Sequence, residues 1–275
     1  MSDIAISDQE FSCFRRFIHE TAGIQLSDAK KVLVSSRLSR RLQARALDSF
    51  GEYFRLITSG SEAAELQMAV DLLTTNETYF FREPKHFDFL RERLRERVAD
   101  RRSASAPFRV WSAAASTGEE AYSIAMLLAD VLGERPWEIF GSDISTRVLE
   151  KARTGHFPMV RATNVPKDYL RRFCLKGVGP EEGTLLINGS LRERVRFEQV
   201  NLTQPLPNVG TFDMIFLRNV MIYFDNETKR SVVSRLIDTL APSGHFLIGH
   251  SETLNGVFED LAPIAPAIYR KAAGG

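Results

Sequence analysis

Cysteine is scarce in this sequence, which has 275 residues and two cysteines, Cys13 and Cys174, that no motif pairs. This scarcity excludes a disulfide-built scaffold and a metal site built from cysteines, and it is typical of proteins from a reducing cytosol. The five histidines show no HxH or HExxH spacing, so we expect no metal site.

Long apolar runs and an excess of one charge are also missing. No apolar stretch reaches membrane-spanning length, and the first residues carry acids where a signal peptide carries basic residues. The 36 basic and 35 acidic residues give a formal net charge of +1, so no global field favours nucleic acid or a membrane surface. We therefore expect a soluble, cytoplasmic protein without membrane insertion.

Three common motifs of nucleotide and acyl chemistry are absent as well: GxGxxG, the P-loop and the GxSxG elbow. The last two absences remove the common phosphoryl- and acyl-transfer designs, and the first weakens a dinucleotide interpretation. A nucleotide-type cofactor of this chain should therefore be a nucleoside without a pyrophosphate, and S-adenosyl-L-methionine (SAM) is the usual one.

The most informative stretch that is present is RVWSAAASTGEEAYSIAM, residues 109–126. A short apolar strand at 108–112 leads into Ser112 to Gly118, where no side chain is larger than threonine, and then into a helix over 117–132. Thr117 and Glu120 fit a capping box for that helix. Such a turn lets a ligand approach the backbone, as in nucleotide-type cofactor sites, although small residues here also serve close packing alone.

Asp143 directly follows the next apolar strand, at 137–142. In doubly wound folds an acidic residue that ends the second strand accepts hydrogen bonds from the ribose hydroxyls. We favour this role for Asp143, and the alternative is that it caps a helix beginning near Ser145.

The chain changes character near residue 75. Residues 1–75 are expected to form an all-helical domain, with a capping box of Ser7 and Glu10 at its first helix. The helical patterns in this domain span 8–20, 27–47, 49–58 and 61–73. Residues 76–107 are expected to form a connecting segment, a helix from Pro84 to about Val98 and a polar loop at 99–107.

Strands and helices alternate in residues 108–275, which predicts a doubly wound, Rossmann-like α/β domain with a mostly parallel sheet. The further elements of this alternation are helices at 145–153 and 227–240 and strands at 212–217 and 244–249. A helix at 166–173, a glycine-rich turn at 176–183 and strands at 184–187 and 195–199 interrupt it. This interruption, about 154–199, predicts a small antiparallel β-subdomain inserted into the larger domain.

Six collinear segments resemble the chemotaxis receptor glutamate O-methyltransferases, the CheR family. They are NETYFFRE (76–83), VWSAAASTGEEAYSIA (110–125), SDIS (142–145), VNL (200–202), RNVMIYFD (218–225) and GHSE (249–252). The resemblance implies SAM-dependent methylation of glutamate side chains on the cytoplasmic helices of methyl-accepting chemotaxis receptors, with S-adenosyl-L-homocysteine as the product. It also implies that the insertion is a possible docking site for the C-terminal peptide of a receptor.

The chemistry agrees with this assignment, because a glutamate side chain has a reference pKa of about 4.3 and is ionised near neutral pH. Its direct SN2 attack on a sulfonium methyl needs desolvation and orientation but no general base. The absence of a His/Asp/Ser constellation is thus expected.

The resemblance also implies roles for individual residues, each with a plainer alternative. Arg82 and Tyr223 are the expected catalytic residues; Arg82 suits the methionine carboxylate or the incoming glutamate, and Tyr223 could border the methyl group or only pack. One of Glu119 and Glu120 could bind the amino group of SAM, or both could favour the helix N-terminus electrostatically. The expected cofactor-binding residues are Asn76, Thr78, Arg82, Glu119, Glu120, Asp143, Asn201, Leu202, Arg218 and Asn219. His250 and Ser251 are weaker candidates.

A run of basic residues lies within the helical pattern 27–47, with no acid between Asp28 and Asp48. An apolar stripe of Val34, Leu38 and Leu42 leaves the adjacent face to basic side chains. The residues expected to dock the substrate are Arg37, Arg40, Arg41 and Arg45. We expect an anionic receptor surface as the partner rather than nucleic acid, because no aromatic residues interleave the bases.

The favoured interpretation is a two-domain SAM-dependent methyltransferase that acts on receptor glutamates. One alternative is a regulatory module that binds SAM without transferring its methyl group. The other is an RNA methyltransferase that uses the basic helix to hold phosphates.

Overall fold

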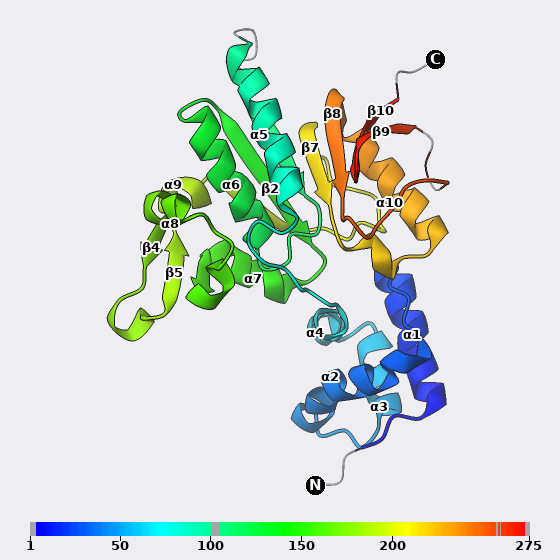
Figure 1. The fold of residues 1–275 in the computed structure, drawn as a ribbon. Helices are drawn as coiled ribbons and strands as arrows, with labels where there is room; N and C mark the ends of the chain where they lie inside the picture. The colour runs from blue at the N-terminus through cyan, green and yellow to red at the C-terminus, as the bar shows by residue number, and fades with distance from the viewer. Residues whose placement is uncertain (1–3, 101–104, 257, 259, 273–275) are drawn as a thin grey trace.

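Four helices form the N-terminal part of the molecule, which lies at the lower end of Figure 1. The structure, a computed structural model, describes residues 4–100, 105–256, 258 and 260–272; the middle of the predicted loop 99–107 lies outside them. The helices are α1 (Asp8–Ala22), α2 (Lys31–Ala44), α3 (Phe50–Thr58) and α4 (Ala63–Leu73), with a short 3-10 turn, η1 (Asp28–Lys30), before α2. They enclose a core of their own around Phe14, Leu38 and Tyr53. The predicted all-helical segment is confirmed, as is the capping box of Ser7 and Glu10.

A seven-stranded sheet forms the centre of the larger part, in the order β6-β2-β1-β7-β8-β10-β9. Its strands are β1 (Phe108–Ser112), β2 (Trp137–Asp143), β6 (Val195–Gln199), β7 (Phe212–Leu217), β8 (Leu240–Ile248), β9 (Leu261–Ala265) and β10 (Ile268–Lys271). The pairings from β6 to β8 are parallel, and β10 is antiparallel to both β8 and β9. The mostly parallel sheet is confirmed, and the antiparallel end of the sheet is an addition that the sequence interpretation missed.

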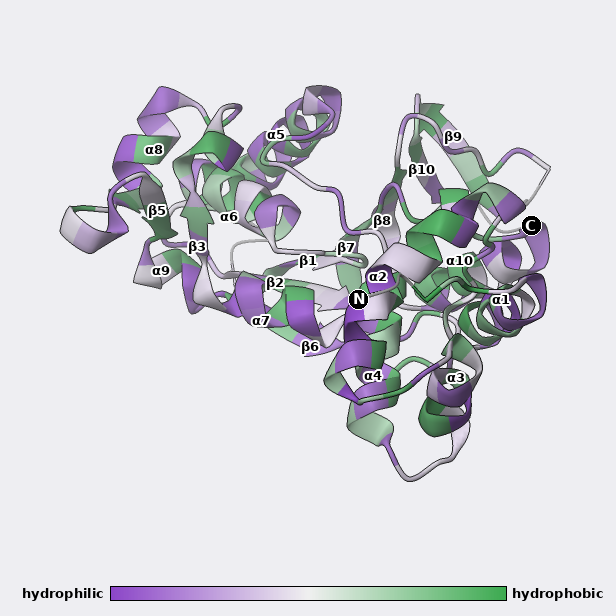
Figure 2. Ribbon diagram, turned by 90° about the horizontal axis from the view of Figure 1, so that it is seen from below, coloured by the Kyte–Doolittle hydropathy of each residue, from purple (hydrophilic) through white to green (hydrophobic). Residues whose placement is uncertain are grey.

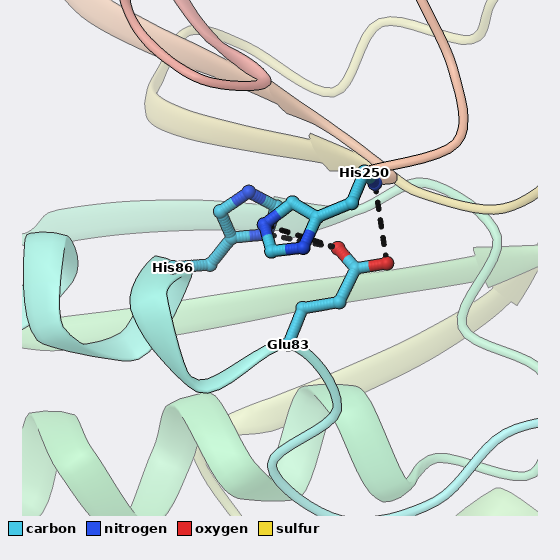
Figure 3. A group of neighbouring side chains, drawn as sticks. All are labelled: Glu83, His86 and His250. Carbon is cyan, nitrogen blue, oxygen red and sulfur yellow. Dashed lines mark hydrogen bonds and ion pairs between the residues drawn. The ribbon is translucent and has the colours of Figure 1, made fainter.

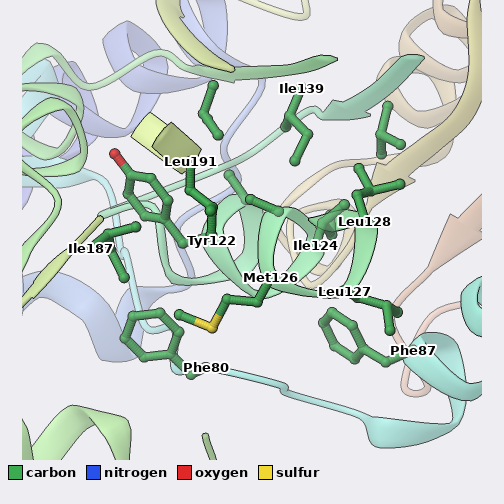
Figure 4. Close-up of a cluster of buried hydrophobic side chains, with 14 of the residues drawn as sticks. Phe80, Phe87, Tyr122, Ile124, Met126, Leu127, Leu128, Ile139, Ile187 and Leu191 are labelled. Atoms are coloured by element: carbon green, nitrogen blue, oxygen red, sulfur yellow. The ribbon is translucent and has the colours of Figure 1, made fainter. Parts of the chain in front are cut away.

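Helices cover both faces of this sheet. On one face, α5 (Pro84–Ala99) and α6 (Glu119–Leu132) pack with α7 (Thr146–Thr154), and Figure 4 shows Ile124, Leu127 and Leu128 of α6 in this layer. On the other face, α10 (Asn226–Asp238) covers Trp111 and Phe140. Because successive side chains of a strand point to opposite faces, neighbours such as Val110 and Trp111 belong to different cores. The doubly wound arrangement is confirmed.

The insertion forms a separate three-stranded antiparallel sheet in the order β3-β5-β4. Figure 1 shows two of these strands, β4 and β5, away from the main sheet. Its elements are β3 (His156–Pro158), η3 (Met159–Ala162), α8 (Lys167–Phe173), β4 (Cys174–Lys176), η4 (Gly179–Glu181), β5 (Thr184–Ile187) and α9 (Gly189–Arg192). The antiparallel subdomain is confirmed, but assigning strand 195–199 to it was wrong. That strand, β6, pairs in parallel with β2 and closes the edge of the main sheet.

The N-terminal helices are joined to the larger part by polar contacts. His19 of α1 lies 2.8 Å from a carboxylate oxygen of Asp225, and Gln25 N donates to the carbonyl of Tyr223. Figure 2 shows from below how these helices sit beside α7 and β6 at one side and α10 at the other. Within the residues described, no helix is long and apolar enough to cross a membrane.

Candidate functional site

A cavity lies between the N-terminal helices and the carboxyl ends of the parallel strands. Its walls come from the end of α1, the connecting segment 74–82 and the segments that follow β1, β2, β6 and β7. In open α/β sheets ligands bind at this edge, where successive strands diverge. The predicted residues Asn76, Thr78, Arg82, Glu120, Asp143, Asn201, Leu202, Arg218, Asn219 and Tyr223 all line this cavity.

The small-residue turn lies against the cavity through Ala113, Ala114 and Ser116. The predicted capping box of Thr117 and Glu120 was wrong, because α6 begins after Gly118, which has a φ of 97°, and has no side-chain cap. The Thr117 hydroxyl donates instead to Glu119, at 2.6 Å. A Cβ at Gly118 would lie 3.0 Å from that of Ala152, so glycine serves both the backbone turn and close packing here.

Asp143 ends β2, lines the cavity and has 8% of its surface exposed. Its Oδ2 accepts from Ser116 N at 2.9 Å, and its Oδ1 accepts from Ser145 N at 3.0 Å. Burial raises the pKa of Asp143 to about 6, although these backbone donors oppose the shift. The bond from Ser145 N, the N-cap residue of α7, agrees with the alternative role at the start of that helix, whereas the next N–H groups, Thr146 N and Arg147 N, donate to Asp71.

The structure separates the two glutamates at the start of α6. Glu120 lines the cavity, where its carboxylate accepts from Ser112 Oγ at 2.7 Å and from Arg218 Nη1 at 2.9 Å. Burial raises the pKa of Glu120, and Arg218 opposes this effect. Glu119 is fully buried outside the cavity lining, 2.6 Å from Arg161 Nη2 of the insertion. Of the two glutamates, Glu120 is therefore the candidate for binding the amino group of SAM.

Arg218 is a buried guanidinium held between two carboxylates. It lies 2.9 Å from Glu120 and 3.0 Å from Glu83, and it also donates to the carbonyl oxygen of Arg82. Burial alone would raise the pKa of Glu83, but Arg218 and its other donors hold that pKa below its ordinary value. The connecting segment is thereby fixed to the end of β7.

Glu83 is also the centre of a group with His86 and His250, shown in Figure 3. Its Oε2 lies 3.4 Å from His86 Nδ1 and 4.0 Å from His250 Nε2. Burial lowers the pKa of His86 to about 3, so its ring is neutral. The three residues have the ligand types of a metal site, but Arg218 already supplies a positive charge to the same oxygen. Motif spacing could not reveal this group, because His250 is distant in the sequence from the other two.

Arg82 reaches the cavity from the connecting segment. Its Nη1 donates to the carbonyl of Glu77 at 3.1 Å, and its guanidinium lies 5.6 Å from the ring centre of Tyr79, which is 45% exposed. Among the described residues, Arg82 has no ion pair with a carboxylate. Beside it, Asn76 accepts a bond from Ser116 Oγ, and Thr78 accepts one from Arg161, through their carbonyl oxygens.

The remaining predicted residues of the site differ in the hydrogen bonds that they make and in whether they line the cavity. Asn201 is committed to the N-terminal part, since its Nδ2 donates to the carbonyl of Thr21 at 2.6 Å. Asn219, with a φ of 59°, donates its backbone N–H to Glu252 at 2.9 Å. The hydroxyl of Tyr223 has no hydrogen bond within the part of the chain that the structure describes. His250 and Ser251 do not line the cavity.

The predicted basic docking face needs a correction, because two acids, one in α4 and one directly before it, compensate two of its arginines. Arg41 makes two bonds to the buried Glu65, at 2.8 and 2.6 Å, and Arg45 pairs with Glu62. Arg37 donates to the carbonyl oxygens of Leu73 and Thr74, at 3.1 and 2.9 Å. Of the four predicted docking arginines, Arg40 alone is exposed without such a partner among the described residues. A linear scan for acids could not detect partners that come from another helix.

Two family descriptions match the chain in turn. Residues 9–74 match the all-alpha domain of CheR methyltransferases, and residues 76–267 match the SAM binding domain of CheR methyltransferases. The chain belongs to the CheR methyltransferase family. It is therefore a SAM-dependent methyltransferase.

Curated members of this family resemble the chain over nearly its full length. A chemotaxis protein methyltransferase of Salmonella typhimurium is 42% identical over 97% of this chain and 91% of its own. One from Escherichia coli is 44% identical over 92% of this chain and 87% of its own. Chemotaxis protein methyltransferase 2 of Pseudomonas aeruginosa is 41% identical over 96% and 93%.

The residues around the cavity fit SAM chemically. SAM carries a ribose diol, a positively charged amino group and sulfonium, and a carboxylate. The cavity offers the carboxylates of Asp143 and Glu120 and apolar walls from Ile24 and Leu202. Sequence reasoning missed Ile24 because it belongs to the helical domain, where no cofactor motif occurs.

Proposed function

We propose that this CheR methyltransferase methylates glutamate side chains on the cytoplasmic helices of methyl-accepting chemotaxis receptors. One observation carries the proposal: Arg82 stands at the cavity with no carboxylate partner among the described residues, whereas Arg218 is neutralised by two. An unpaired guanidinium suits an incoming carboxylate, which it binds through two parallel hydrogen bonds. The enzyme would accordingly work in the cytoplasm, where these receptor helices lie.

The transfer that we propose is a direct displacement. SAM supplies an electrophilic methyl group on a sulfonium. The glutamate oxygen forms a bond to the methyl carbon as the carbon–sulfur bond breaks, which gives a methyl ester and S-adenosyl-L-homocysteine. Because the glutamate is already ionised near neutral pH, the chain needs only to desolvate and orient it. Arg82 is suited to hold the carboxylate, and Tyr223 to border the reacting atoms.

The cofactor contacts that we propose follow the walls of the cavity. Asp143 accepts hydrogen bonds from the ribose, and Glu120 pairs with the amino group. Asn201 and Leu202 lie against the adenine, while Asn76, Thr78, Arg218 and Asn219 complete the polar wall. Glu119 is left out of this set because it is buried against Arg161.

Two further surfaces are proposed to bind the receptor. The N-terminal helices recognise its acidic helices, with Arg40 as the exposed base of α2. The β-subdomain docks the C-terminal peptide of a receptor at β4, an edge strand whose Leu175 is 57% exposed. An edge strand offers unpaired backbone groups to an extended peptide.

Incubation with labelled SAM and receptor cytoplasmic fragments tests the proposal. Base-labile methyl esters on glutamates are the expected product, and the Arg82→Ala variant should bind SAM yet transfer little label. Label recovered in RNA, or binding of SAM with no transfer to any receptor fragment, would contradict it. Arg95→Ala, which removes an exposed arginine of α5 outside the cavity and outside both proposed docking surfaces, is the matched control for the loss of an arginine.

A further inference from the structure

The last turn of α4, in the helical part, directly holds the start of α7 in the cofactor-binding part. Asp71 has 2% of its surface exposed. Its carboxylate accepts from Thr146 N and from Thr146 Oγ1, each at 3.0 Å, and from Arg147 N at 3.4 Å. The N-cap residue of α7, Ser145, makes no side-chain capping bond. An N-terminal helix therefore supplies the cap that α7 lacks.

A second side chain of α4 holds the preceding residue of the same loop. Gln67 Nε2 donates to Asp71 at 2.8 Å and to the carbonyl of Ile144 at 3.1 Å. Gln199, which ends β6, donates to that carbonyl as well, at 3.1 Å, and to Gln67 Oε1 at 2.7 Å. Hydrogen bonds from α4 and from the end of β6 thus hold the loop Asp143–Ser145.

This loop begins at Asp143, which lines the cavity. Asp143 Oδ1 accepts from Ser145 N, the residue directly before those that Asp71 holds. Ile144, between them, lines the cavity. Any movement of Ser145 and Thr146 away from α4 therefore changes the position of the Asp143 carboxylate.

We propose that Asp71 is a positioning residue for cofactor binding, through which the N-terminal helices fix the Asp143 loop in the geometry that receives the ribose of SAM. The proposal rests on the ribose contact of Asp143 proposed above. It makes cofactor binding and the docking of α4 mutually dependent, since a coupling between two binding events acts equally in both directions. The helical part, which we propose to bind the receptor, would thereby also raise the affinity for SAM.

Asp71→Asn in the full chain tests this coupling. The amide keeps the size of the side chain but replaces one acceptor oxygen with a donor. The Kd for SAM, measured by calorimetry without receptor, should rise about fivefold or more, and the KM for SAM should rise in parallel. The kcat at saturating SAM should stay within about twofold of the wild type, because bound cofactor restores the loop. Glu62→Gln, which alters the same helix away from the loop, is the control and should leave the Kd unchanged.

Hydrogen exchange gives a readout that a general loss of stability would not produce. In Asp71→Asn the amides of Thr146 and Arg147 should exchange faster, while those of α10 are unchanged. SAM should slow exchange in α4 of the wild type, and less so in the variant. An unchanged Kd, or a fall in kcat and melting temperature with the KM for SAM unaltered, would overturn the proposal. If instead Asp143→Ala leaves the Kd unchanged, the ribose contact itself fails, whatever Asp71 does.

Discussion

At the scale of single residues, the site combines carboxylates whose charge is stabilised to different degrees. Glu83 is kept ionised by Arg218, whereas burial raises the pKa of Asp143 to about 6 and that of Glu120 in the same direction. A bound positive group would favour the ionised form of Glu120, because it adds an opposite charge nearby. The protonation of the cavity and the binding of SAM should therefore be linked.

Asp143 should make SAM binding depend on pH. If only its ionised form accepts both ribose hydroxyls, the apparent Kd should rise as the pH falls through about 6, by about tenfold at pH 5. The folded-state pKa is raised, so protonation at pH 5 does not itself weaken the fold. Calorimetric titrations between pH 5 and 8 measure the effect. Asp143→Asn should bind SAM more weakly at pH 8 by about 1.5–3 kcal/mol and lose the dependence; a variant that keeps the wild-type profile would exclude Asp143 as its source.

Tyr223 provides a separate prediction, since the residue lines the cavity and its hydroxyl has no hydrogen bond among the described residues. Tyr223→Phe should lower kcat about tenfold or more while the Kd for SAM changes little, because the hydroxyl would act mainly in the transition state. Single-turnover methylation of receptor fragments, together with calorimetry, separates the two quantities. Wild-type turnover in the variant would leave the residue a packing role only.

The sequence predicted the site residues that end strands, such as Asp143 and Arg218, because parallel strands bring their carboxyl ends to one edge. It did not predict the partners of these residues. His250 lies beside Glu83 and His86 only because the chain folds. Asp71 of the helical part accepts a hydrogen bond from Thr146 of the α/β part. No local pattern encodes contacts between residues so far apart in the chain.

At the scale of elements, periodicity located the helices well and the shortest strands poorly. The amphipathic stripes of α2 and α6 are long enough to show a helical period. β3 and β4 have three residues each, which is too short to show an alternation, and β9 contains Pro263. The charge of the α2 surface was misjudged for a related reason. The acidic residues that pair with its arginines lie in α4 and directly before it, outside the stretch in which the sequence pattern was read.

A pair of variants on α2 distinguishes docking from folding. Arg40→Glu changes an exposed side chain, so the melting temperature should hold while receptor methylation falls about two- to tenfold. Arg41→Glu places a second carboxylate beside the buried Glu65 and should cost at least about 2 kcal/mol of folding free energy. Thermal unfolding and methylation assays at several salt concentrations provide the measurements.

Exposed charges act within a Debye length of about 8 Å at physiological salt. Wild-type methylation should therefore fall with added salt, and methylation by Arg40→Glu should fall less. Equal methylation by Arg40→Glu and the wild type across the series would place the docking surface elsewhere.

At the scale of the whole molecule, the division into a helical part and an α/β part follows from the change in sequence pattern near residue 75. Their relative placement does not, because it depends on a few polar contacts: His19 with Asp225, Asn201 with Thr21, and Asp71 with the start of α7. The cavity lies where these two parts meet, so it belongs to neither alone. Cofactor binding should therefore stabilise both parts together.

SAM should raise the melting temperature of the full chain and keep its unfolding a single transition. A ligand that binds only the folded state contributes about 2.7 kcal/mol at a concentration of a hundred times its Kd. Because α1 and α4 help to form the cavity wall or hold its loop, the helical part should share this stabilisation although its core is separate. Calorimetric scans with increasing SAM, combined with hydrogen exchange of α1 and α4, follow the two parts separately. If the helices unfolded at a temperature independent of SAM while the α/β part was stabilised, the two parts would be uncoupled and the cavity would depend on the sheet alone.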